Sequence, residues 1–587
     1  MRMSLVDLFR RLSTRRRNQF GIVLCLMFVG AVGELVSIGA VLPFLAVISD
    51  PEGAVRQARV QDLLKALGVD TPAQVAVAAA ILFAVAALAA AAARLLLVYV
   101  SQRFVFGLAR DISVAIFSRT LHQPYSYHTG QNSSETLAAI NKAQLVAGQI
   151  LMPLTQAASA SVIAVFILIG LLVIDPLIAL GSGLGFAAVY LLVMRTTRAV
   201  MVGNGEIIAR AQGERLQAAN EGIGGIRDVL LDRSQAAFIA RFEETEARLG
   251  AAQALNNFIA QAPRFVVEGI GLALIAVLTL ILTLRDGGFI AALPVLGALA
   301  LGAQRFVPLM QQAYSGWAAT LTGGAMLADI LDILRLSDAP QFSAPRNGER
   351  LPFEYDLVFR KVGFSYPQGS RPAVENIDLV IPKGARVGLA GRTGSGKSTL
   401  MDLVLGLLSP DRGRILVDGV ELTDATRSAW QARIAHVPQS IYLSDASIAE
   451  NIAFGVPTGE IDRTRVAAAA AQAELSDVIK ALPQGYETLV GERGIRLSGG
   501  QRQRVGIARA LYKRADVLVF DEATSALDTE TEAAVMHSIE RLGRDLTIFI
   551  IAHRLSTLDG CDMVLTLEAG RVQSVGTLDE NGGKPLS

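Results

Sequence analysis

The second half of the chain contains a glycine-rich turn directly after a short apolar strand. The expected strand is Arg386–Ala390, and the stretch that follows it, GRTGSGKST, has the spacing G-x-x-x-x-G-K-[ST]. Backbone N–H groups of such a turn close around phosphate at a helix N-terminus, Lys397 neutralises the β- and γ-phosphates, and the Ser398 hydroxyl suits Mg²⁺. The stretch therefore predicts a nucleotide phosphate site. Its members are Gly391, Thr393, Gly394, Ser395, Gly396, Lys397, Ser398 and Thr399.

Two acidic residues follow another apolar strand. Val517–Phe520 is the expected strand, and Asp521 and Glu522 stand at its C-terminal end, where ligands gather in open α/β sheets. Asp521 suits the Mg²⁺ shell, and Glu522 suits the activation of an attacking water. An acidic pair after a strand is often only a solvated strand end, but the phosphate loop favours the catalytic interpretation here.

Further motifs complete a recognisable set: LSGGQ at Leu497–Gln501, SALD ending at Asp528, and IIAHR containing His553. Over residues 355–587 the chain resembles the nucleotide-binding domain of ABC transporters. The resemblance implies ATP and Mg²⁺ as cofactors and gives a role to each matching residue. Tyr366 would stack on adenine, Gln439 would contact Mg²⁺ and signal to the membrane half, Asp528 would contact the dimer partner, and His553 would position the γ-phosphate. The signature residues Ser498, Gly499, Gly500 and Gln501 would contact ATP bound to the opposite subunit.

The chain carries one copy of each motif. The signature lies too far along the chain from the phosphate loop to serve the same nucleotide, so a second copy of the domain is implied. A symmetric homodimer would complete two ATP sites. The near-balance of 54 basic and 53 acidic residues gives no support to a nucleic-acid partner.

The composition of the first half indicates a membrane protein. Hydrophobic residues make up 52% of the chain and charged residues 18%, against roughly 25% in soluble proteins. Up to Leu336 the chain alternates charged stretches with apolar runs of the roughly 20 residues that a bilayer requires. We predict six spans, at about 20–48, 73–100, 143–173, 176–194, 254–284 and 289–309.

The arginines set the expected orientation, because cytoplasmic flanks carry the Lys/Arg excess. Arginines precede the first span and fill the segments between spans two and three and between spans four and five. Those segments are therefore cytoplasmic, and their helical composition predicts helices that extend beyond the membrane. Breaks at 123–131 and 221–225 predict short transverse helices. An amphipathic helix containing Val60 and Leu67 is expected outside the membrane.

These features define the expected architecture. Residues 1–336 form an all-α, six-helix exporter-type membrane domain, residues 337–354 a proline-containing linker, and residues 355–587 an α/β P-loop ATPase domain. The membrane half resembles the exporter class of ABC transporters, in which the segment before the signature contacts the partner's coupling helix. The resemblance implies a multi-pass protein of the bacterial cytoplasmic membrane, with its ATPase domain in the cytoplasm.

The transported substrate is expected to be an amphiphile. The opening span, with Glu34 inside it, resembles that of bacterial flippases of lipid-linked oligosaccharides, which implies a polyprenyl-diphosphate-linked oligosaccharide. The alternatives are export of another lipid, a peptide or a drug, import, and an ATP-gated channel or regulatory role.

Three arginines stand inside the predicted spans: Arg94, Arg264 and Arg305. Counted from the outer ends of their spans, all three fall in the cytoplasmic half at about 1.5 Å per residue. Ionisable groups at such depth are functional candidates, and guanidinium binds diphosphate bidentately. We expect one arginine layer that attracts a phosphate-bearing head group. The alternative is that Arg264 and Arg305 snorkel to the interface or pair with Glu268.

Overall fold

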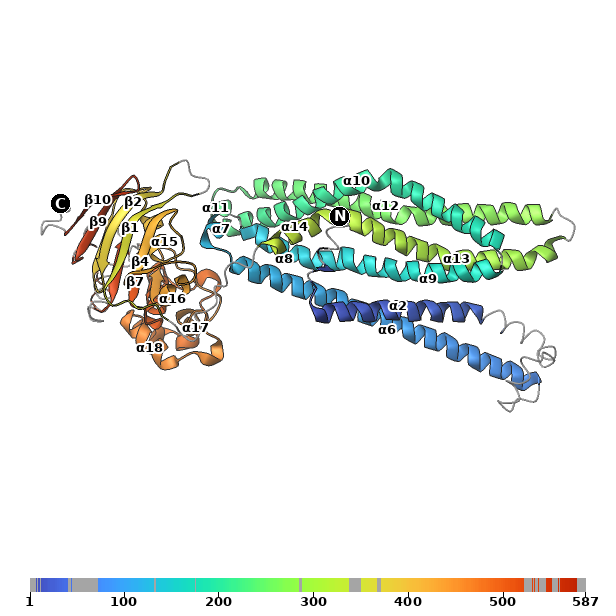
Figure 1. Cartoon of the computed structure of the whole chain (residues 1–587), viewed down its shortest axis with the longest axis horizontal. Coiled ribbons are helices and arrows are strands. Elements are labelled where there is room, and N and C mark those ends of the chain that lie inside the picture. Colours follow the sequence, from blue (N-terminus) through green and yellow to red (C-terminus); the bar gives the residue numbers. More distant parts are fainter. Residues whose placement is uncertain are drawn as a thin grey trace. The chain divides into compact units, whose positions relative to one another are not determined.

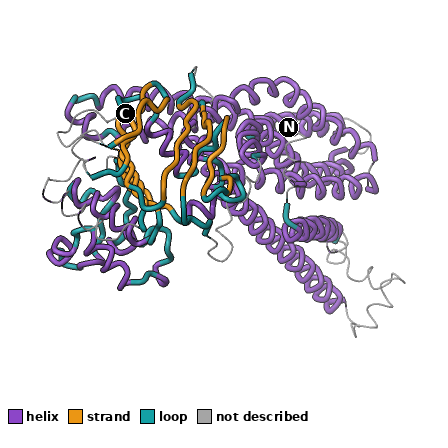
Figure 2. Tube along the Cα trace, turned by 60° about the vertical axis from the view of Figure 1, so that its left-hand side comes forward, coloured by secondary structure: helices purple, strands orange, loops and turns teal. Residues whose placement is uncertain are grey.

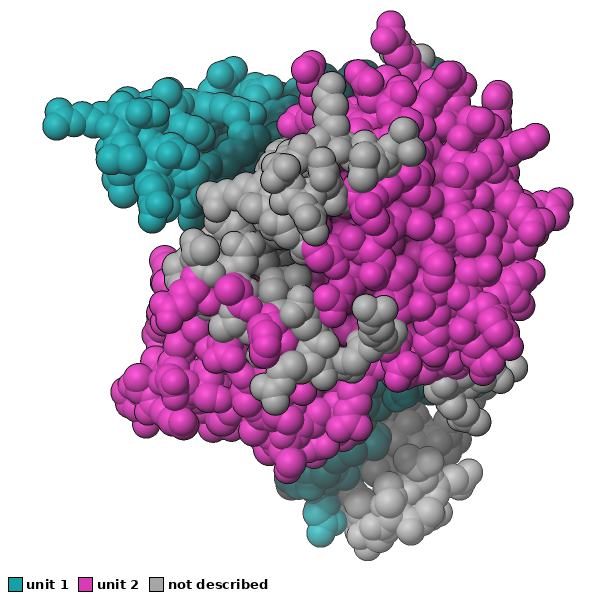
Figure 3. Space-filling view, turned by 90° about the vertical axis from the view of Figure 1, so that its left-hand side faces the viewer, with its two compact units in different colours: residues 1–121, 131–337 teal, residues 122–130, 338–587 magenta. Residues whose placement is uncertain are grey.

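The computed structural model describes residues 12–40, 72–130, 133–174, 176–283, 288–336, 350–366, 371–521, 545–551, 560–577 and a few isolated positions between them. The chain divides into two compact units, one of residues 1–121 and 131–337 and the other of residues 122–130 and 338–587 (Figure 3). Described helices make up the first unit, whereas every described strand belongs to the second (Figure 2). The expected external helix between residues 55 and 68 lies outside the described residues.

Long helices run through the first unit. They are α2 (Thr14–Gly39), α6 (Pro72–Leu121), α8 (Ser133–Val146), the π-helical turn η1 (Ala147–Leu151), α9 (Met152–Ile174), α10 (Pro176–Gly224), α11 (Ile226–Leu231), α12 (Gln235–Thr283), α13 (Gly288–Thr322) and α14 (Gly324–Arg335). Where the structure describes them, the six apolar runs lie in these helices, the third of them in the continuous series from α8 to α9.

Three of these helices are much longer than a bilayer is thick. Helix α6 has 50 residues and α10 and α12 have 49 each, which at 1.5 Å per residue gives about 75 Å, against about 30 Å of hydrocarbon. Among the described residues, the helical stretches Thr14–Val36, Gln74–Leu121 and Glu135–Ile169 are long and apolar enough to cross a membrane, and a bent pair, Phe306–Thr322 with Gly324–Arg335, passes jointly. The helices therefore extend beyond the membrane, as the sequence predicts.

Small residues allow the helices to pack closely. Helix α13 lies along α9, and α10 lies along α12 (Figure 1). A Cβ added to Gly316 of α13 would stand 2.2 Å from the Cβ of Ala157 on α9. At Gly323, where α13 bends by 55° into α14, an added Cβ would stand 2.0 Å from Ile150 in η1. Such contacts leave no room for a side chain, so glycine fixes this packing.

The two short helices predicted at the breaks are present, with one shift. Helix α7 spans Tyr125–Gly130 inside the first break, and α11 begins at Ile226, directly after the second break. Helix α10 includes Glu221 and ends at Gly224. The interruption between α10 and α11 is therefore shorter than the predicted break at 221–225. The segment 122–130, which contains α7, belongs to the same compact unit as residues 338–587.

The second unit contains two sheets. The strands of the first, in the order β2-β1-β4-β5, are β1 (Asp356–Phe364), β2 (Val374–Pro382), β4 (Arg412–Val417) and β5 (Val420–Glu421), all antiparallel. Those of the second, in the order β10-β9-β3-β8-β7-β6, are β3 (Arg386–Ala390), β6 (Ile434–Val437), β7 (Val517–Asp521), β8 (Thr547–Ile551), β9 (Met563–Glu568) and β10 (Arg571–Gly576). Only the β9–β10 pair of this second sheet is antiparallel.

The burial of the strands follows their positions. Strand β2 alternates buried and exposed residues, as expected for a sheet with one covered face, whereas all five residues of β8 are buried, as expected for a central parallel strand. Leu351 and Phe353, at the end of the expected linker, are buried in the core between the sheets, where the Phe353 ring meets Trp430 edge-on.

The remaining helices of the second unit surround the parallel sheet. They are α15 (Lys397–Val404), α16 (Arg427–Gln431), α17 (Ile448–Ile452), α18 (Arg463–Gln472), α19 (Ser476–Ala481) and α20 (Gly499–Tyr512), with short 3₁₀ turns between them. Helices α17, α18 and α20 form a cluster with its own apolar core, which is continuous with β6 and β7. The two ends that matter for function are the N-terminus of α15 and the N-terminus of α20.

Candidate functional site

The phosphate loop has the geometry that the sequence predicts. It joins β3 to α15, and Gly391, Gly394 and Gly396 all have positive φ, at 148°, 80° and 103°. An added Cβ would stand 2.4 Å from the Leu567 carbonyl oxygen at Gly391 and 2.6 Å from the Ala373 carbonyl oxygen at Gly396. Both positions therefore require glycine, for backbone conformation and for space. The backbone is free to curl around a group placed at the helix N-terminus.

The polar side chains of the loop indicate that its ligand is an anion. Lys397 is 7% exposed, and its Nζ donates hydrogen bonds to the carbonyl oxygens of Gly391 at 2.7 Å and Arg392 at 3.1 Å. The buried hydroxyl of Ser395 has no hydrogen-bond partner among the described residues. Ser398, which carries a hydroxyl, is exposed at the start of α15. The Lys397 ammonium, bonded to two carbonyl oxygens of the loop, and the buried Ser395 hydroxyl fit the phosphates of a nucleotide.

The strand order places Asp521 at the same edge of the sheet as this loop. Strand β8 lies between β3 and β7, and all three are parallel, so their C-terminal ends meet at one edge of the sheet. Asp521 pairs with Ile551 at the last position of the β7–β8 ladder. Among the described residues, no group of three or more His, Cys, Asp or Glu side chains could hold a metal ion.

One carboxyl group beside Asp521 was not predicted from the sequence. Burial, and secondly the charge of Asp521, raises the pKa of Asp402 in α15 to about 6. Tyr125 of α7 lies near the same carboxyl, and burial, followed by the charges of Asp402 and Tyr366, raises the pKa of its hydroxyl. Neither residue belongs to a motif. Tyr125 comes near this carboxyl because α7 belongs to the same compact unit as α15.

The other predicted site residues are placed as follows. Tyr366 follows β1, its ring meets Phe364 edge-on at 5.1 Å, and its hydroxyl lies 3.4 Å from the Thr399 hydroxyl of the phosphate loop. Gln439 is an exposed residue just after β6, the edge strand beside β7. Thr393 is exposed on the loop. Glu522, Asp528 and His553 lie outside the described residues; β7 ends directly before Glu522, and β8 ends two residues before His553.

The signature residues begin a helix of their own. Ser498 is the N-cap of α20, and its Oγ accepts a hydrogen bond from the Gln501 backbone N–H at 3.2 Å. The Gln501 side chain in turn accepts from the Ser498 N–H at 2.9 Å. This capping box fixes the helix start, and Ser498 remains exposed while Gly499 and Gly500 add no side chains. The end of α20 thus presents N–H groups that suit a phosphate outside this unit.

A matched pair of serines separates the capping role from the phosphate role. Ser447 caps α17 with the same box, through Glu450. Ser447→Ala and Ser498→Ala should each destabilise the chain by roughly 0.5–2 kcal/mol, because both remove an N-cap. Only Ser498→Ala should also reduce ATP hydrolysis at saturating ATP. Denaturant unfolding and steady-state ATPase assays measure the two effects, and an equal loss of ATPase in both variants would contradict a phosphate contact by Ser498.

Two of the three membrane arginines have carboxylate neighbours. Arg94 on α6 forms an ion pair with Glu34 on α2, and Glu34 is only 4% exposed. Arg264 donates from Nε to Glu268 at 2.7 Å, one helical turn further along α12. The Arg264–Glu268 pair is the one that the alternative interpretation anticipated, whereas Glu34 was not expected as a partner. The side chain of Arg305 lies outside the described residues.

Family models match both parts of the chain. The model described as "ABC transporter" matches residues 374–525, and the model described as "ABC transporter transmembrane region" matches residues 20–287. The ATP-dependent lipid A-core flippase of Burkholderia orbicola (strain AU 1054) is 33% identical over 507 residues, which cover 83% of this chain and 80% of that protein. The chain therefore belongs to the ABC transporters.

Two further comparisons indicate which class of ABC transporter this chain represents. The ATP-dependent lipid A-core flippase of Cupriavidus pinatubonensis (strain JMP 134 / LMG 1197) is 45% identical over 262 residues, so the matched part spans 44% of each chain. A solved structure, that of a bacterial Atm1-family ABC exporter with ATP bound, superimposes with a TM-score of 0.75 at 25% identity and covers 96% of this chain and 95% of that one. The protein is thus an exporter-type ABC transporter, which couples ATP hydrolysis to transport across a membrane.

These findings confirm the predicted fold class and the ATPase. They also confirm the coarser functional prediction, an ATP-driven exporter. The relatives reported above are named lipid A-core flippases. The polyprenyl-diphosphate-linked oligosaccharide, inferred from the opening span and the three arginines, therefore stays a prediction.

Proposed function

We propose that this chain forms a homodimer in the bacterial cytoplasmic membrane and uses Mg²⁺-dependent ATP hydrolysis to flip a phosphate-bearing glycolipid of the lipid A-core type. The observation that carries the substrate is the name shared by relatives that align along most of the chain, such as the Burkholderia orbicola flippase. A polyprenyl-diphosphate-linked oligosaccharide, which the opening span favours, has the same chemistry in its head group and is the second candidate.

The ATP site is proposed to work through positioning and charge. Lys397 and the loop N–H groups hold the phosphates, Ser398, Asp521 and Gln439 hold Mg²⁺, and Glu522 polarises the attacking water. His553 positions the γ-phosphate, and Tyr366 stacks on adenine. The metal supplies charge neutralisation at the phosphates when bound.

The homodimer follows from the two helix N-termini. The phosphate loop and the start of α20 are both built to hold phosphate, yet one is the N-terminus of α15 and the other is the exposed cap of a helix in a separate cluster. Two copies in a symmetric pair would give each nucleotide one loop and one signature. No second type of chain is needed, because every motif residue fits the pattern.

The ion pairs in the membrane half suggest how an anionic head group is recognised. A guanidinium in a carboxylate pair is neutralised, and a substrate phosphate that binds the guanidinium must compete with that carboxylate. Both arginine side chains are accessible, since 43% of Arg94 and 50% of Arg264 is exposed. We propose that Arg94, Arg264 and Arg305 exchange carboxylate or water for substrate phosphate.

Substrate-stimulated ATPase in proteoliposomes tests the substrate class. Purified lipid A-core, a polyprenyl-diphosphate-linked oligosaccharide, a dephosphorylated lipid A-core and a neutral glycolipid should be compared at equal mole fraction. We expect stimulation and flipping with the two phosphorylated lipids, strongest with lipid A-core, and little with the others. Equal stimulation by the dephosphorylated and neutral lipids would contradict phosphate recognition, and stimulation by the polyprenyl lipid alone would reverse the order of the two candidates.

A further inference from the structure

Helix α12 contains a proline within the predicted fifth span. Pro263 is buried, and it has no N–H with which to bond the carbonyl oxygen four residues before it, that of Ile259. Ile259 is itself buried, and a carbonyl oxygen without a partner is costly inside a bilayer, where water is scarce. This carbonyl therefore needs a donor from another helix.

That donor is a tyrosine hydroxyl of α13. Tyr314 is 1% exposed, and its hydroxyl donates to the Ile259 carbonyl oxygen at 3.1 Å. The Tyr314 ring packs against the rings of Tyr190 on α10 and Trp317 on α13, with 5.5 Å between ring centres in both pairs. The hydroxyl is thus held in place, and its hydrogen bond replaces the helical one that the proline removes.

The next carbonyl of α12 is also bonded from α13. Gln311 stands one turn before Tyr314, and its Nε2 donates to the Ala260 carbonyl oxygen at 2.7 Å and to the Ser315 hydroxyl at 3.1 Å. Its Oε1 accepts a hydrogen bond from the Tyr190 hydroxyl at 3.2 Å. The reverse orientation of the amide would set two acceptors against each other at Ala260. We call the two hydrogen bonds from α13 to α12 the carbonyl contacts.

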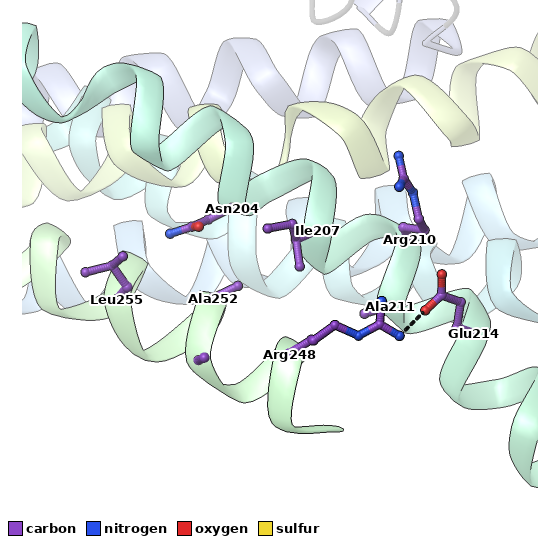
Figure 4. Close-up of a pocket in the computed structure, with 9 residues that line it drawn as sticks. Asn204, Ile207, Arg210, Ala211, Glu214, Arg248, Ala252 and Leu255 are labelled. Carbon is purple, nitrogen blue, oxygen red and sulfur yellow. Dashed lines mark hydrogen bonds and ion pairs between the residues drawn. The ribbon is translucent and has the colours of Figure 1, made fainter. Parts of the chain in front are cut away.

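The part of α12 before the proline is tied to both neighbouring helices. Asn256, which is 4% exposed, donates to the Thr322 hydroxyl of α13 at 3.0 Å and accepts from Asn204 of α10 at 2.9 Å. Further toward the cytoplasm, Arg248 pairs with Glu214 of α10 at 2.9 Å (Figure 4). The position of this part of α12 is therefore set by its own contacts, and the direction of the helix after the proline depends on the bend.

The arginine proposed to bind substrate stands at this bend. Arg264 directly follows the proline, and its side chain is 50% exposed. Val267, one turn after the proline, is 1% exposed and belongs to the same apolar cluster as Tyr190 and Tyr314. Tyr190 also lies near the Arg264–Glu268 pair. Because a helix changes direction at a proline, the bend decides where the Arg264 guanidinium points.

We propose that Gln311 and Tyr314 are positioning residues for substrate recognition. Their carbonyl contacts fix the bend of α12 and so present the Arg264 guanidinium in one direction on the exposed face of the helix. Tyr314 is buried, so it acts through Arg264 and not by contact with the substrate. The proposal rests on the proposed function, since it takes Arg264 as a contact for the phosphate of the transported lipid.

Lipid-stimulated ATPase activity in proteoliposomes, with purified lipid A-core as the lipid, tests the proposal. Tyr314→Phe keeps the ring and removes the hydroxyl, whereas Gln311→Leu keeps the bulk and removes the amide. In both variants the lipid concentration at half-maximal stimulation should rise by roughly tenfold, because a misdirected guanidinium loses a charge-assisted contact. The maximal stimulated rate should change little. Tyr99→Phe, which removes a hydroxyl bonded to Arg103 on α6, should behave as the wild type does.

Two double-variant comparisons separate positioning from a general structural role. In an Arg264→Gln background, Tyr314→Phe should change the half-maximal lipid concentration by less than about twofold, because no guanidinium is left to position. In a Pro263→Ala background, residue 263 regains its N–H and the Ile259 carbonyl regains a helical partner. Removal of the Tyr314 hydroxyl should again have an effect below about twofold. Full additivity in both backgrounds would overturn the positioning role.

The direction of residue 264 can also be measured without substrate. The chain has two cysteines, so Cys25→Ser and Cys561→Ser combined with Arg264→Cys leave a single thiol. Its rate of modification by a charged methanethiosulfonate should change severalfold when Tyr314→Phe or Gln311→Leu is added, and should not change with Tyr99→Phe. An unchanged rate in both variants of α13 would show that the carbonyl contacts do not orient α12, whatever Arg264 binds.

The outcomes distinguish this proposal from the function on which it rests. If Arg264→Gln responds to lipid A-core as the wild type does, the phosphate contact is wrong, even where the thiol rates show that α13 orients α12. If Arg264→Gln loses the response while Tyr314→Phe and Gln311→Leu keep it, the phosphate contact stands and the positioning role is overturned.

Discussion

Replacing Glu522 by Gln should leave ATP binding intact and lower steady-state ATP hydrolysis by roughly 10²- to 10⁴-fold. A positioned general base typically contributes a factor of this size, and glutamine keeps the shape of the side chain but cannot accept the proton. The loop residues that hold phosphate are unchanged. The variant should therefore accumulate as a closed dimer with ATP bound, which size-exclusion chromatography and nucleotide retention would detect.

Two other variants serve as controls for this experiment. Glu530→Gln removes an exposed carboxylate a short distance further along the chain and should hydrolyse ATP normally. Lys397→Ala should lose ATP binding as well as turnover, because the buried ammonium is the principal charge of the phosphate loop. Wild-type hydrolysis by Glu522→Gln would show that another group activates the water.

Replacing Arg94, Arg264 and Arg305 together by Gln should abolish flipping of a phosphorylated lipid while basal ATPase activity remains. Each guanidinium–phosphate contact in a poorly hydrated site contributes about 1.5–3 kcal/mol, so three lost contacts lower the affinity for the head group by well over a hundredfold. None of these residues belongs to the ATPase domain. A fluorescent-lipid flipping assay in proteoliposomes, combined with ATPase measurements, separates the two activities.

The carboxylate partners provide the matched control. Glu268→Gln releases Arg264 from its ion pair on an exposed surface of α12, so flipping should be retained or improved. Unimpaired flipping in the triple arginine variant would contradict the arginine layer and the proposal of a phosphate-bearing substrate. Loss of both flipping and ATPase activity would instead indicate that the arginines support the fold. The next variant would then keep Arg94, which is paired with the buried Glu34, and change only Arg264 and Arg305.

Much of the ATP site is predictable because its determinants are local. The turn after β3 requires glycine where φ is positive and where a Cβ would meet a carbonyl oxygen, and Lys397 and Ser398 follow at fixed spacing. The capping of α20 by Ser498 and Gln501 likewise depends on residues three apart. A sequence displays such features directly, since the interacting groups are neighbours along the chain.

The long membrane helices are equally visible in the sequence. Continuous apolar runs with arginine-rich flanks predict where α6, α10 and α12 enter and leave the bilayer, and their extension into the cytoplasm follows from helical composition. Burial in hydrocarbon is a property of each segment by itself, because the backbone of a helix satisfies its own hydrogen bonds.

The tertiary structure alone decided which distant residues meet. The parallel order β3-β8-β7 places Asp521 at the same sheet edge as the phosphate loop. Helix α7 joins the ATPase unit with Tyr125 near Asp402, although both residues lie outside any motif. The pairing of Arg94 with Glu34 depends on how α6 and α2 align side by side. Helix pairing is set by the summed packing of many side chains, and no single residue in the sequence records it.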